Sequence, residues 1–175
     1  MNRRKSLGFT LAETAVTLSV AGVLTATALP NLSALQASRQ VQDEAALLAG
    51  TLRLARSEAL RRDELVTVCA LQTGASEPTC DADSPGRTDW SAGWMVFVDR
   101  GRRGLLDEGD LRIQVQALPA NRVALTGSWP KLSFHGTGVQ SGFSARFNLV
   151  APGADPLVVC VAKPGRARVA RGVVC

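Results

Sequence analysis

The sequence Gly8-Phe9-Thr10-Leu11-Ala12-Glu13 opens a stretch of apolar and small residues that continues to Leu29. A helix over residues 9–29 would be about 31 Å long, which matches a hydrocarbon core of about 30 Å. The preceding residues 1–8 contain three basic side chains and no acid. Because positive flanks stay on the cytoplasmic side of a membrane, the pattern predicts a single membrane-spanning segment with a cytoplasmic N-terminus.

An ordinary secretory signal peptide is the alternative interpretation of this stretch. Its apolar region would be about 7–15 residues long and would be followed by a small-residue cleavage site. The apolar run here is longer, and it contains a carboxylate, Glu13, five residues after Gly8. A lone carboxylate inside a membrane costs about 2.5–3.5 kcal/mol on insertion scales, so Glu13 is expected to have a partner.

Residues 8–13 resemble the type IV pilin superfamily, because they match its prepilin motif residue by residue. The resemblance implies a leader peptide at residues 1–8, cut by a prepilin peptidase between Gly8 and Phe9, and methylation of the new N-terminal Phe9. It also implies that Glu13 pairs with the N-terminal amine of a neighbouring subunit during assembly. Pro30 falls where many pilins have a helix-kinking proline.

Residues 30–62 are expected to continue the helix as a periplasmic, amphipathic segment. Six apolar residues recur at helical spacing: Val41, Ala45, Leu48, Leu52, Ala55 and Ala59. Charged and polar residues lie between them, so the stripe predicts the face on which a head packs. Pro30 lacks a backbone donor and is expected to bend or loosen the helix.

Residues 63–175 change to short β-branched and apolar runs that Gly- and Pro-bearing segments divide. The candidate strands are Leu65–Leu71, Gly93–Asp99, Leu111–Ala117, Arg122–Thr126, Lys131–Phe134, Phe143–Val150 and Leu157–Ala162. One long helix followed by a run of strands predicts an α+β fold. The helix would span the membrane with its first half, and its second half would pack on a β-rich C-terminal head of antiparallel sheets.

The head resembles the FimT/GspH branch of the superfamily, which contains minor pilins of type IV pili and minor pseudopilins of type II secretion. The similarity lies in Arg56-Ser57-Glu58-Ala59, in residues 90–99, and in the following Gly101, Gly104 and Asp110. It implies a single-pass protein of the bacterial inner membrane with a periplasmic head, which enters a pilus or pseudopilus. Its partners would be the membrane, the prepilin peptidase and other pilin subunits.

Four cysteines follow the apolar segment: Cys69, Cys80, Cys160 and Cys175. An even number after a membrane-targeting segment predicts disulfides in an oxidising compartment. Zinc is the alternative, but zinc ligands usually lie two to four residues apart, whereas these pairs are 11 and 15 residues apart. Three connectivities are open, and pairing between sequence neighbours is only a preference.

The C-terminal residues 161–175 are the main candidate for ligand binding. They contain four basic residues and no acid: Lys163, Arg166, Arg168 and Arg171. Loss of residues 1–8 would lower the formal net charge of the chain from +5 to +2, so this local excess is large. Arg166 and Arg168 would share one face of a strand, guanidinium groups suit phosphate oxygens, and Gly165 permits a tight turn. A solvated edge strand is the alternative interpretation.

The run Gly165-Arg166-Ala167-Arg168 resembles the GRxR motif near the C-terminus of FimT minor pilins, which is associated with DNA binding during natural transformation. The resemblance implies DNA binding by Arg166 and Arg168 at the Gly165 turn, and proximity adds Lys163 and Arg171. A bridge between Cys160 and Cys175 would close the segment into a loop and lower the entropy cost of ordering the arginines. Residues 161–175 contain no aromatic residue, so contacts to the DNA backbone, independent of sequence and sensitive to salt, are expected.

Two functions are therefore considered. The first is a minor type IV pilin that binds extracellular DNA through a C-terminal arginine loop for natural transformation. The alternative is a structural minor pilin or pseudopilin that primes assembly of a pilus or a type II secretion pseudopilus without binding DNA.

The sequence offers little for catalysis or metal binding. It has one histidine, His135, and no tyrosine, so a nucleophile–base arrangement would depend on that residue. The acidic loop 99–110 fits a calcium loop poorly, because Gly101 and Arg103 stand where oxygen ligands are needed. We expect no enzymatic activity, no metal and no cofactor.

Overall fold

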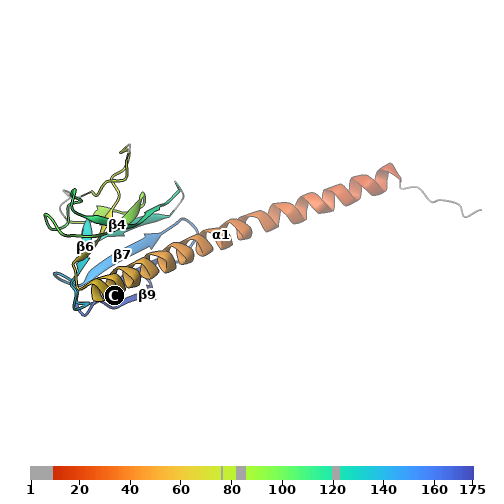
Figure 1. The fold of residues 1–175 in the computed structure, drawn as a ribbon. Coiled ribbons are helices and arrows are strands. Elements are labelled where there is room, and N and C mark those ends of the chain that lie inside the picture. The colour runs from red at the N-terminus through yellow and green to blue at the C-terminus, as the bar shows by residue number, and fades with distance from the viewer. Residues whose placement is uncertain (1–9, 76, 82–85, 120–122) are drawn as a thin grey trace, which may run out of the picture.

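The structure of the chain, a computed structural model, describes residues 10–75, 77–81, 86–119 and 123–175, without the side chains of residues 25–31. The expected leader, with Gly8 and Phe9, lies outside the described residues. Within them, one long helix, α1 (Leu11–Arg62), leads into a head of nine strands (Figure 1). The fold is α+β with antiparallel sheets, as the sequence predicts.

Local chemistry defines both ends of α1. Thr10 is the N-cap, and its Oγ1 accepts a hydrogen bond from the Glu13 backbone N–H at 3.3 Å. The helix runs without a break through Pro30 and ends at Asp63, whose left-handed φ of 55° stops it. No helix among the described residues reaches the combination of length and hydropathy that a membrane span requires.

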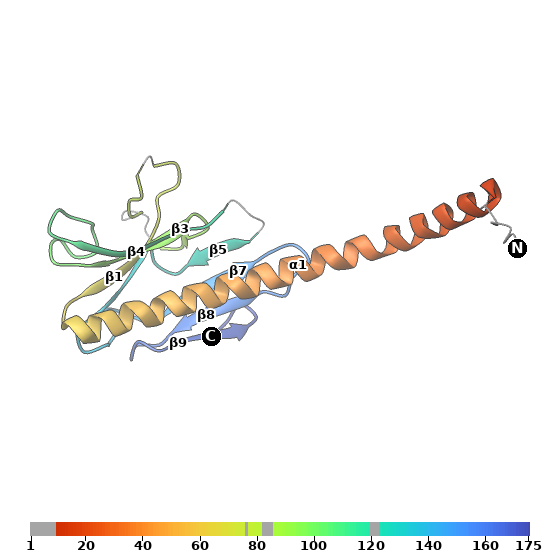
Figure 2. The same cartoon turned by 45° about the vertical axis from the view of Figure 1, so that its right-hand side comes forward.

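The second half of α1 packs on the head, while the first half projects away from it (Figures 1 and 2). The predicted stripe from Val41 to Ala59 is confirmed, because each of its six residues has at most 1% of its surface exposed. Apolar side chains on the projecting half, such as Leu11 and Val16, are instead exposed.

Two antiparallel sheets form the head. The first has the strand order β4-β3-β1-β6, and the second has the order β2-β5-β7-β8-β9. The strands are β1 (Val66–Ala70), β2 (Thr88–Asp89), β3 (Gly93–Val98), β4 (Leu111–Ala117), β5 (Ala124–Gly127), β6 (Lys131–Phe134), β7 (Ala145–Val150), β8 (Leu157–Val161) and β9 (Ala167–Arg171).

Two tryptophans tie the layers together. Trp94 on β3 is fully buried, and its Nε1 donates to Thr51 Oγ1 on α1 at 3.2 Å. Trp90 packs edge to face on Phe147 of β7, with 4.8 Å between the ring centroids. Such aromatic pairs contribute about 0.5–1.5 kcal/mol beyond their buried area, so they fix one layer against the next.

Two strands, β2 and β9, were not among the candidates from the sequence. Strand β2 has two residues, too few to show any periodicity. Strand β9 reads Ala-Arg-Val-Ala-Arg, a weak alternation that pairing with the buried strand β8 nevertheless stabilises. The sequence predicts a loop that carries the arginines. This prediction is wrong for Ala167–Arg171, which form β9, the edge strand of a β-hairpin.

Candidate nucleic-acid interface

The β8–β9 hairpin carries the predicted motif at its turn. The Gly165 N–H donates to Ala162 O at 2.7 Å, and the Ala162 N–H donates to Arg166 O at 3.0 Å. Gly165 has a φ of +82°, and a Cβ there would collide with the carbonyl oxygen of Gly138. Glycine is therefore required at this position, both for its backbone angle and for the lack of space.

The turn is fastened to the rest of the head. Arg56 on α1 donates from Nε to Gly138 O at 2.9 Å, beneath Gly165. The Gln140 N–H donates to Lys163 O at 3.1 Å. The turn is thus held to the loop before β7, and through Arg56 to the helix, so the arginines that follow start from a fixed point.

Strand register places three arginines on one face of the second sheet. Arg146 on β7 pairs with Cys160 on β8, and Cys160 pairs with Arg168 on β9. Directly paired residues project from the same face of a sheet. Arg166 lies two residues before Arg168 and therefore shares that face.

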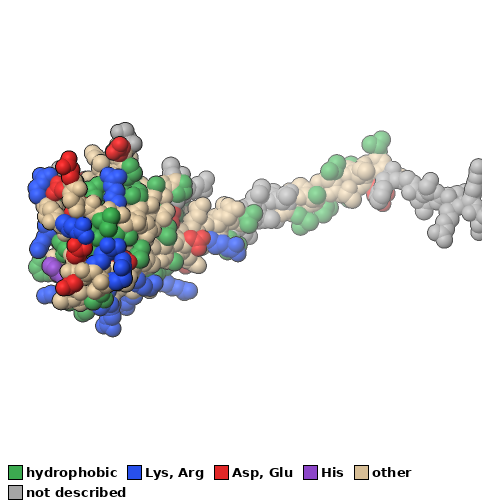
Figure 3. Space-filling model, viewed as in Figure 1, with side chains coloured by type: hydrophobic (Ala, Val, Ile, Leu, Met, Phe, Trp, Pro, Cys, Tyr) green, Lys and Arg blue, Asp and Glu red, His purple; other side chains and the backbone are tan. Residues whose placement is uncertain are grey.

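This face points away from the helix. The alternate residues of the same strands, Phe147 and Val159, belong to the main hydrophobic core together with the buried stripe of α1. Because successive side chains of a strand point to opposite faces, Arg146 and Arg168 point outward. In the view of Figure 3, Lys and Arg side chains project from the lower edge of the head, where Figure 1 places β9.

The outward arginines line a shallow groove. A hollow of about 670 Å³ is bordered by Arg146, Arg166 and Arg168. A neighbouring hollow of about 220 Å³ is bordered by Arg87 and shares Ser128 and Arg146 with the first, so the two are continuous. We call this surface, defined by Arg87, Arg146, Arg166 and Arg168, the arginine groove.

Among the described residues, the arginines of the groove do not pair with Asp or Glu side chains. No Asp or Glu is among the described residues that border the two hollows. Within the described ranges, the salt bridges involve other arginines: Arg61, Arg62, Arg100 and Arg102. Arg87 donates to Thr126 Oγ1 at 3.2 and 3.0 Å, and Arg168 donates to Cys175 O at 2.9 Å. Arg87 is thus oriented by a hydroxyl and Arg168 by a main-chain oxygen, and all four arginines of the groove remain exposed.

The sequence-predicted basic residues do not all come together. Arg166 and Arg168 line the groove, whereas Lys163 is exposed on the turn and does not border it. Arg171 pairs with Leu157, three positions after Arg168, and so lies on the opposite face of β9.

Arg87 and Arg146 are groove residues that the sequence did not reveal. The alternation within Ala145–Val150 could have placed Arg146 outward, since its neighbours are apolar. The register that aligns it with Arg168 across β8 depends on pairing between segments far apart in the chain, which no local pattern encodes.

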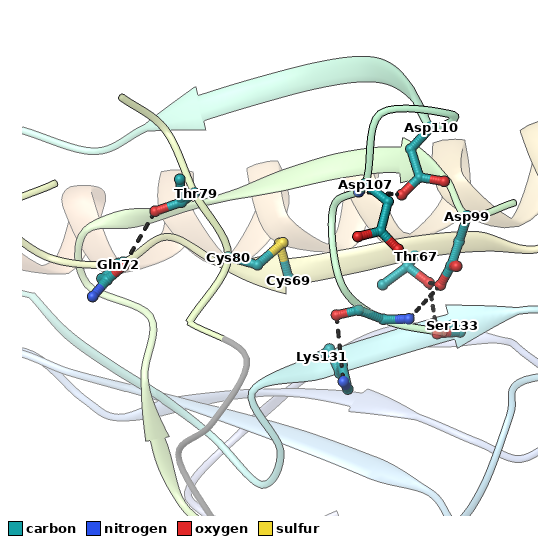
Figure 4. The surroundings of a disulfide bond; sticks show 11 residues. Thr67, Cys69, Gln72, Thr79, Cys80, Asp99, Asp107, Asp110, Lys131 and Ser133 are labelled. Atoms are coloured by element: carbon teal, nitrogen blue, oxygen red, sulfur yellow. Dashed lines mark hydrogen bonds between the residues drawn. A yellow bond between two sulfur atoms is a disulfide. The ribbon is translucent and has the colours of Figure 1, made fainter. Parts of the chain in front are cut away.

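Both cysteine pairs are joined between sequence neighbours. Cys160 and Cys175 have Cα atoms 5.8 Å apart, and Cys69 and Cys80 have Cα atoms 5.5 Å apart. The first bridge holds residue 175 beside the groove, where its carbonyl oxygen accepts from Arg168. The second bridge joins β1 to the segment before β2 (Figure 4).

The carboxylates of the acidic loop between β3 and β4 accept hydrogen bonds from the same loop and from the neighbouring strand β1. Asp110 Oδ1 accepts from the Arg100 N–H at 2.8 Å, and Asp107 accepts from the Arg102 N–H at 2.8 Å. Hydrogen bonds from Arg102 also lower the pKa of the Asp107 carboxyl below its usual value. Asp99 Oδ2 accepts from Thr67 Oγ1 at 2.8 Å (Figure 4). Across the described residues, no group of three or more His, Cys, Asp or Glu side chains is arranged to hold a metal ion.

The remaining predicted residues lie away from the groove. Glu13 is exposed in the first turn of α1, on the projecting half of the helix. The half-buried His135 begins the loop after β6, where its N–H donates to Val139 O at 2.9 Å.

Comparison with known families gives one match. The family model of the type II transport protein GspH matches residues 44–165, which include the second half of α1 from Glu44 and the head up to the hairpin turn. The matched residues end at Gly165, so Arg166 and Arg168 lie beyond them. No curated protein matches the chain.

Two solved structures share the fold. Both are crystal structures of the type IV minor pilin FimU of Pseudomonas aeruginosa (strain PAO1), in space groups P21 and P65. The first has a TM-score of 0.55 at 19% identity, over 75% of this chain and 89% of FimU. The second has a TM-score of 0.52 at 19% identity, over 74% of this chain and 91% of FimU.

Proposed function

This chain belongs to the GspH family, and on that premise we propose that it is a minor type IV pilin that binds extracellular DNA for natural transformation. Family and fold are those of minor pilins and pseudopilins, which associate with other pilin subunits in a pilus or pseudopilus. The DNA contact is assigned to the arginine groove.

The observation that supports DNA binding is the alignment of four exposed arginines on one outward face of the second sheet. Guanidinium groups form forked, charge-assisted hydrogen bonds with phosphate oxygens. The hairpin is held by its turn contacts and by the Cys160–Cys175 bridge. Less side-chain and loop entropy is then lost when DNA binds.

Removal of the two motif arginines tests this proposal. The full chain in nonionic detergent is titrated with fluorescent duplex DNA, and its affinity is compared with that of Arg166→Ala/Arg168→Ala. We expect the double variant to bind at least about tenfold more weakly, because it loses two of four phosphate contacts.

The matched control is Lys163→Ala/Arg171→Ala. It removes the same charge from the same hairpin, but from positions off the groove face. If affinity depends on the groove, this variant keeps most of it. Equal losses in the two double variants would show that net charge alone attracts DNA, and unchanged affinity in the first would contradict the proposal.

A structural role without DNA is the second candidate function, and the exposed apolar surface of α1 favours it. Large apolar side chains project from the first half of the helix: Leu11, Val16, Leu18, Val20, Val23 and Leu24. A contiguous apolar surface of this kind marks contact with a membrane or with other subunits. In this role the chain would prime a pilus or type II pseudopilus. Deletion would then reduce piliation or secretion, and the purified chain would not bind DNA.

Both functions include the same processing and location. We propose cleavage by a prepilin peptidase after Gly8, methylation of Phe9, and insertion of residues 9–29 in the inner membrane with the head in the periplasm. Mass spectrometry of the chain purified from membranes tests this: the expected N-terminus is methylated Phe9. An N-terminus at Met1, or one created by a cut C-terminal to the apolar segment, would contradict it.

A further inference from the structure

The head also contains an apolar hollow outside the arginine groove. Its volume is about 480 Å³, and its lining includes Trp129, Pro130, Leu132 and Phe143. Two aromatic rings at its rim are open to solvent, because 44% of Trp129 and 80% of Phe143 is exposed. The other two tryptophans of the chain, Trp90 and Trp94, are fully buried.

The apolar hollow and the arginine groove share no lining residue, but their linings are adjacent in the chain at three places. Ser128 borders the groove and Trp129 borders the hollow; Ser144 and Phe143 make a second such pair. Arg87 and Gly86 make a third pair. Consecutive Cα atoms are about 3.8 Å apart, so the backbone of the hollow's lining lies next to that of the groove's lining at these three places.

Hydrogen bonds to the backbone support both exposed rings. Trp90 donates from Nε1 to the carbonyl oxygen of Trp129 at 3.0 Å. The Gln140 side-chain amide donates to the carbonyl oxygen of Phe143. These contacts hold the backbone of each aromatic residue in place while its ring stays accessible, which lowers the entropy lost when a ligand binds.

We propose that this combined surface binds single-stranded DNA, with phosphates along the arginine groove and bases stacked on Trp129 and Phe143. The inference rests on the proposed DNA-binding function and specifies its ligand. Unpaired bases present free π-faces that stack on aromatic side chains, whereas the bases of a duplex are already paired and stacked. The combination of a cationic groove with aromatic platforms is typical of proteins that bind single strands without sequence preference.

The proposal changes one expectation from the sequence. The absence of aromatic residues in residues 161–175 favours contacts to the DNA backbone alone. The fold supplies the rings from elsewhere, because Trp129 follows β5 and Phe143 precedes β7, the strands beside the arginine row. Their positions next to Ser128 and Ser144 bring them to the border of the groove.

The test compares a fluorescent oligothymidine with a duplex of the same length, using the full chain in nonionic detergent. Trp129→Ala and Phe143→Ala are each expected to weaken single-strand binding by about 5- to 150-fold, which is the usual contribution of one stacked base. Duplex affinity is expected to be unchanged. Trp129→Phe keeps a ring and is expected to retain most of the single-strand affinity.

Two controls separate stacking from damage to the fold. Leu111→Ala removes an apolar residue of similar exposure, 42%, from β4 of the other sheet and is expected to change neither affinity. Intrinsic fluorescence supplies a direct reading, since Trp129 is the exposed member of the three tryptophans. Single-stranded DNA is expected to quench this emission, and duplex DNA is not.

Each outcome has a distinct meaning. If neither form of DNA binds, the proposed function fails and this inference fails with it. If both forms bind equally, without quenching and without an effect of Trp129→Ala or Phe143→Ala, the DNA-binding function stands but the stacking surface is excluded. If these variants keep their DNA affinity but no longer enter filaments, the hollow is a subunit contact and the inference is overturned.

Discussion

Gly165 links the sequence motif to the shape of the hairpin. Its φ of +82° belongs to the left-handed region, which costs residues with a Cβ about 1–2 kcal/mol. The space beside it is filled by Gly138 O and by Arg56 Nε, which would lie 3.0 Å from an added Cβ. Any side chain here would therefore push the turn off the helix.

We predict that Gly165→Ala destabilises the head by more than the backbone cost alone. Gly74→Ala is the matched control, because Gly74 has a nearly identical φ of +80° but nothing within 4 Å of an added Cβ. The control is expected to lose about 1–2 kcal/mol of unfolding free energy, and Gly165→Ala more than that, together with DNA affinity. Chemical denaturation measures the loss of unfolding free energy in each variant. Equal losses in the two variants would contradict the close packing of this turn.

Glu58 near the end of α1 is expected to make the stability of the fold depend on pH. Its carboxylate accepts from Arg61 Nη2 at 2.6 Å and from Arg62 Nε at 2.7 Å, and these hydrogen bonds lower its pKa from 4.5 to about 2. A lowered carboxyl pKa contributes stability that is fully present above pH 4.5 and is lost as the pH falls toward 2.

Glu58→Gln is therefore expected to reduce the loss of thermal stability between pH 4.5 and about 2. The measurement is the thermal unfolding midpoint across this range. Glu77→Gln, which removes an exposed carboxylate between β1 and β2, serves as the control. An identical pH profile for the wild type and Glu58→Gln would rule out this helix-end cluster as the origin of the acid sensitivity.

The hairpin of β8 and β9 determines which arginines lie on the groove face of the second sheet. Pairing with β8 sends Arg168 to the same outward face as Arg146, which lies across β8, whereas Arg171 points to the opposite face. The Cys160–Cys175 bridge then holds the segment after β9 over the outward face. An edge strand has one free side, so this bridge and the turn contacts limit its fraying.

We predict separable effects for the two disulfides. Cys160→Ser/Cys175→Ser should lower the unfolding free energy by about 3 kcal/mol, the value for a closed loop of about 15 residues. It should also weaken DNA binding, because the main-chain oxygen of Cys175 is no longer held where it orients Arg168. Cys69→Ser/Cys80→Ser, which opens a loop of similar length, should lose comparable stability and keep its DNA affinity. The same DNA affinity in both variants would show that the Cys160–Cys175 bridge does not position the groove.

The whole molecule combines the projecting first half of α1, here called the stalk, with a head (Figure 2). The arginine groove lies on the face of the second sheet that points away from the helix. Buried core residues begin at Ala37, and the described residues before it add none to the core. Changes on the stalk should therefore affect assembly without affecting the fold of the head.

Glu13→Gln tests this separation. It removes the carboxylate from the first helical turn, so the variant is expected to enter filaments poorly while the head unfolds at the same temperature. Glu13→Asp keeps the charge and is expected to restore part of the incorporation. Immunoblotting of sheared filaments, beside thermal unfolding of the purified chain, makes the measurement. Normal incorporation of Glu13→Gln would contradict an assembly role for this residue.

The sequence predicts the architecture better than it predicts the groove. The stripe from Val41 to Ala59 and most strands follow from local periodicity, because burial of one face imposes it. Strand β9 and the alignment of Arg146 with Arg168 depend on pairing between distant segments. The GRxR resemblance points to Arg166 and Arg168 through a motif, but only the register shows that Arg87 and Arg146 extend the same surface and that Arg171 does not.

The salt dependence of DNA binding tests the central claim most directly. Four phosphate contacts predict a slope of log K against log salt concentration of about −3.6 for duplex DNA, measured between about 50 and 200 mM salt. Arg166→Ala/Arg168→Ala should bind more weakly, with a slope of about −1.8. The same affinity and slope for the wild type and the double variant would contradict the arginine groove as the site where this pilin-type protein binds DNA.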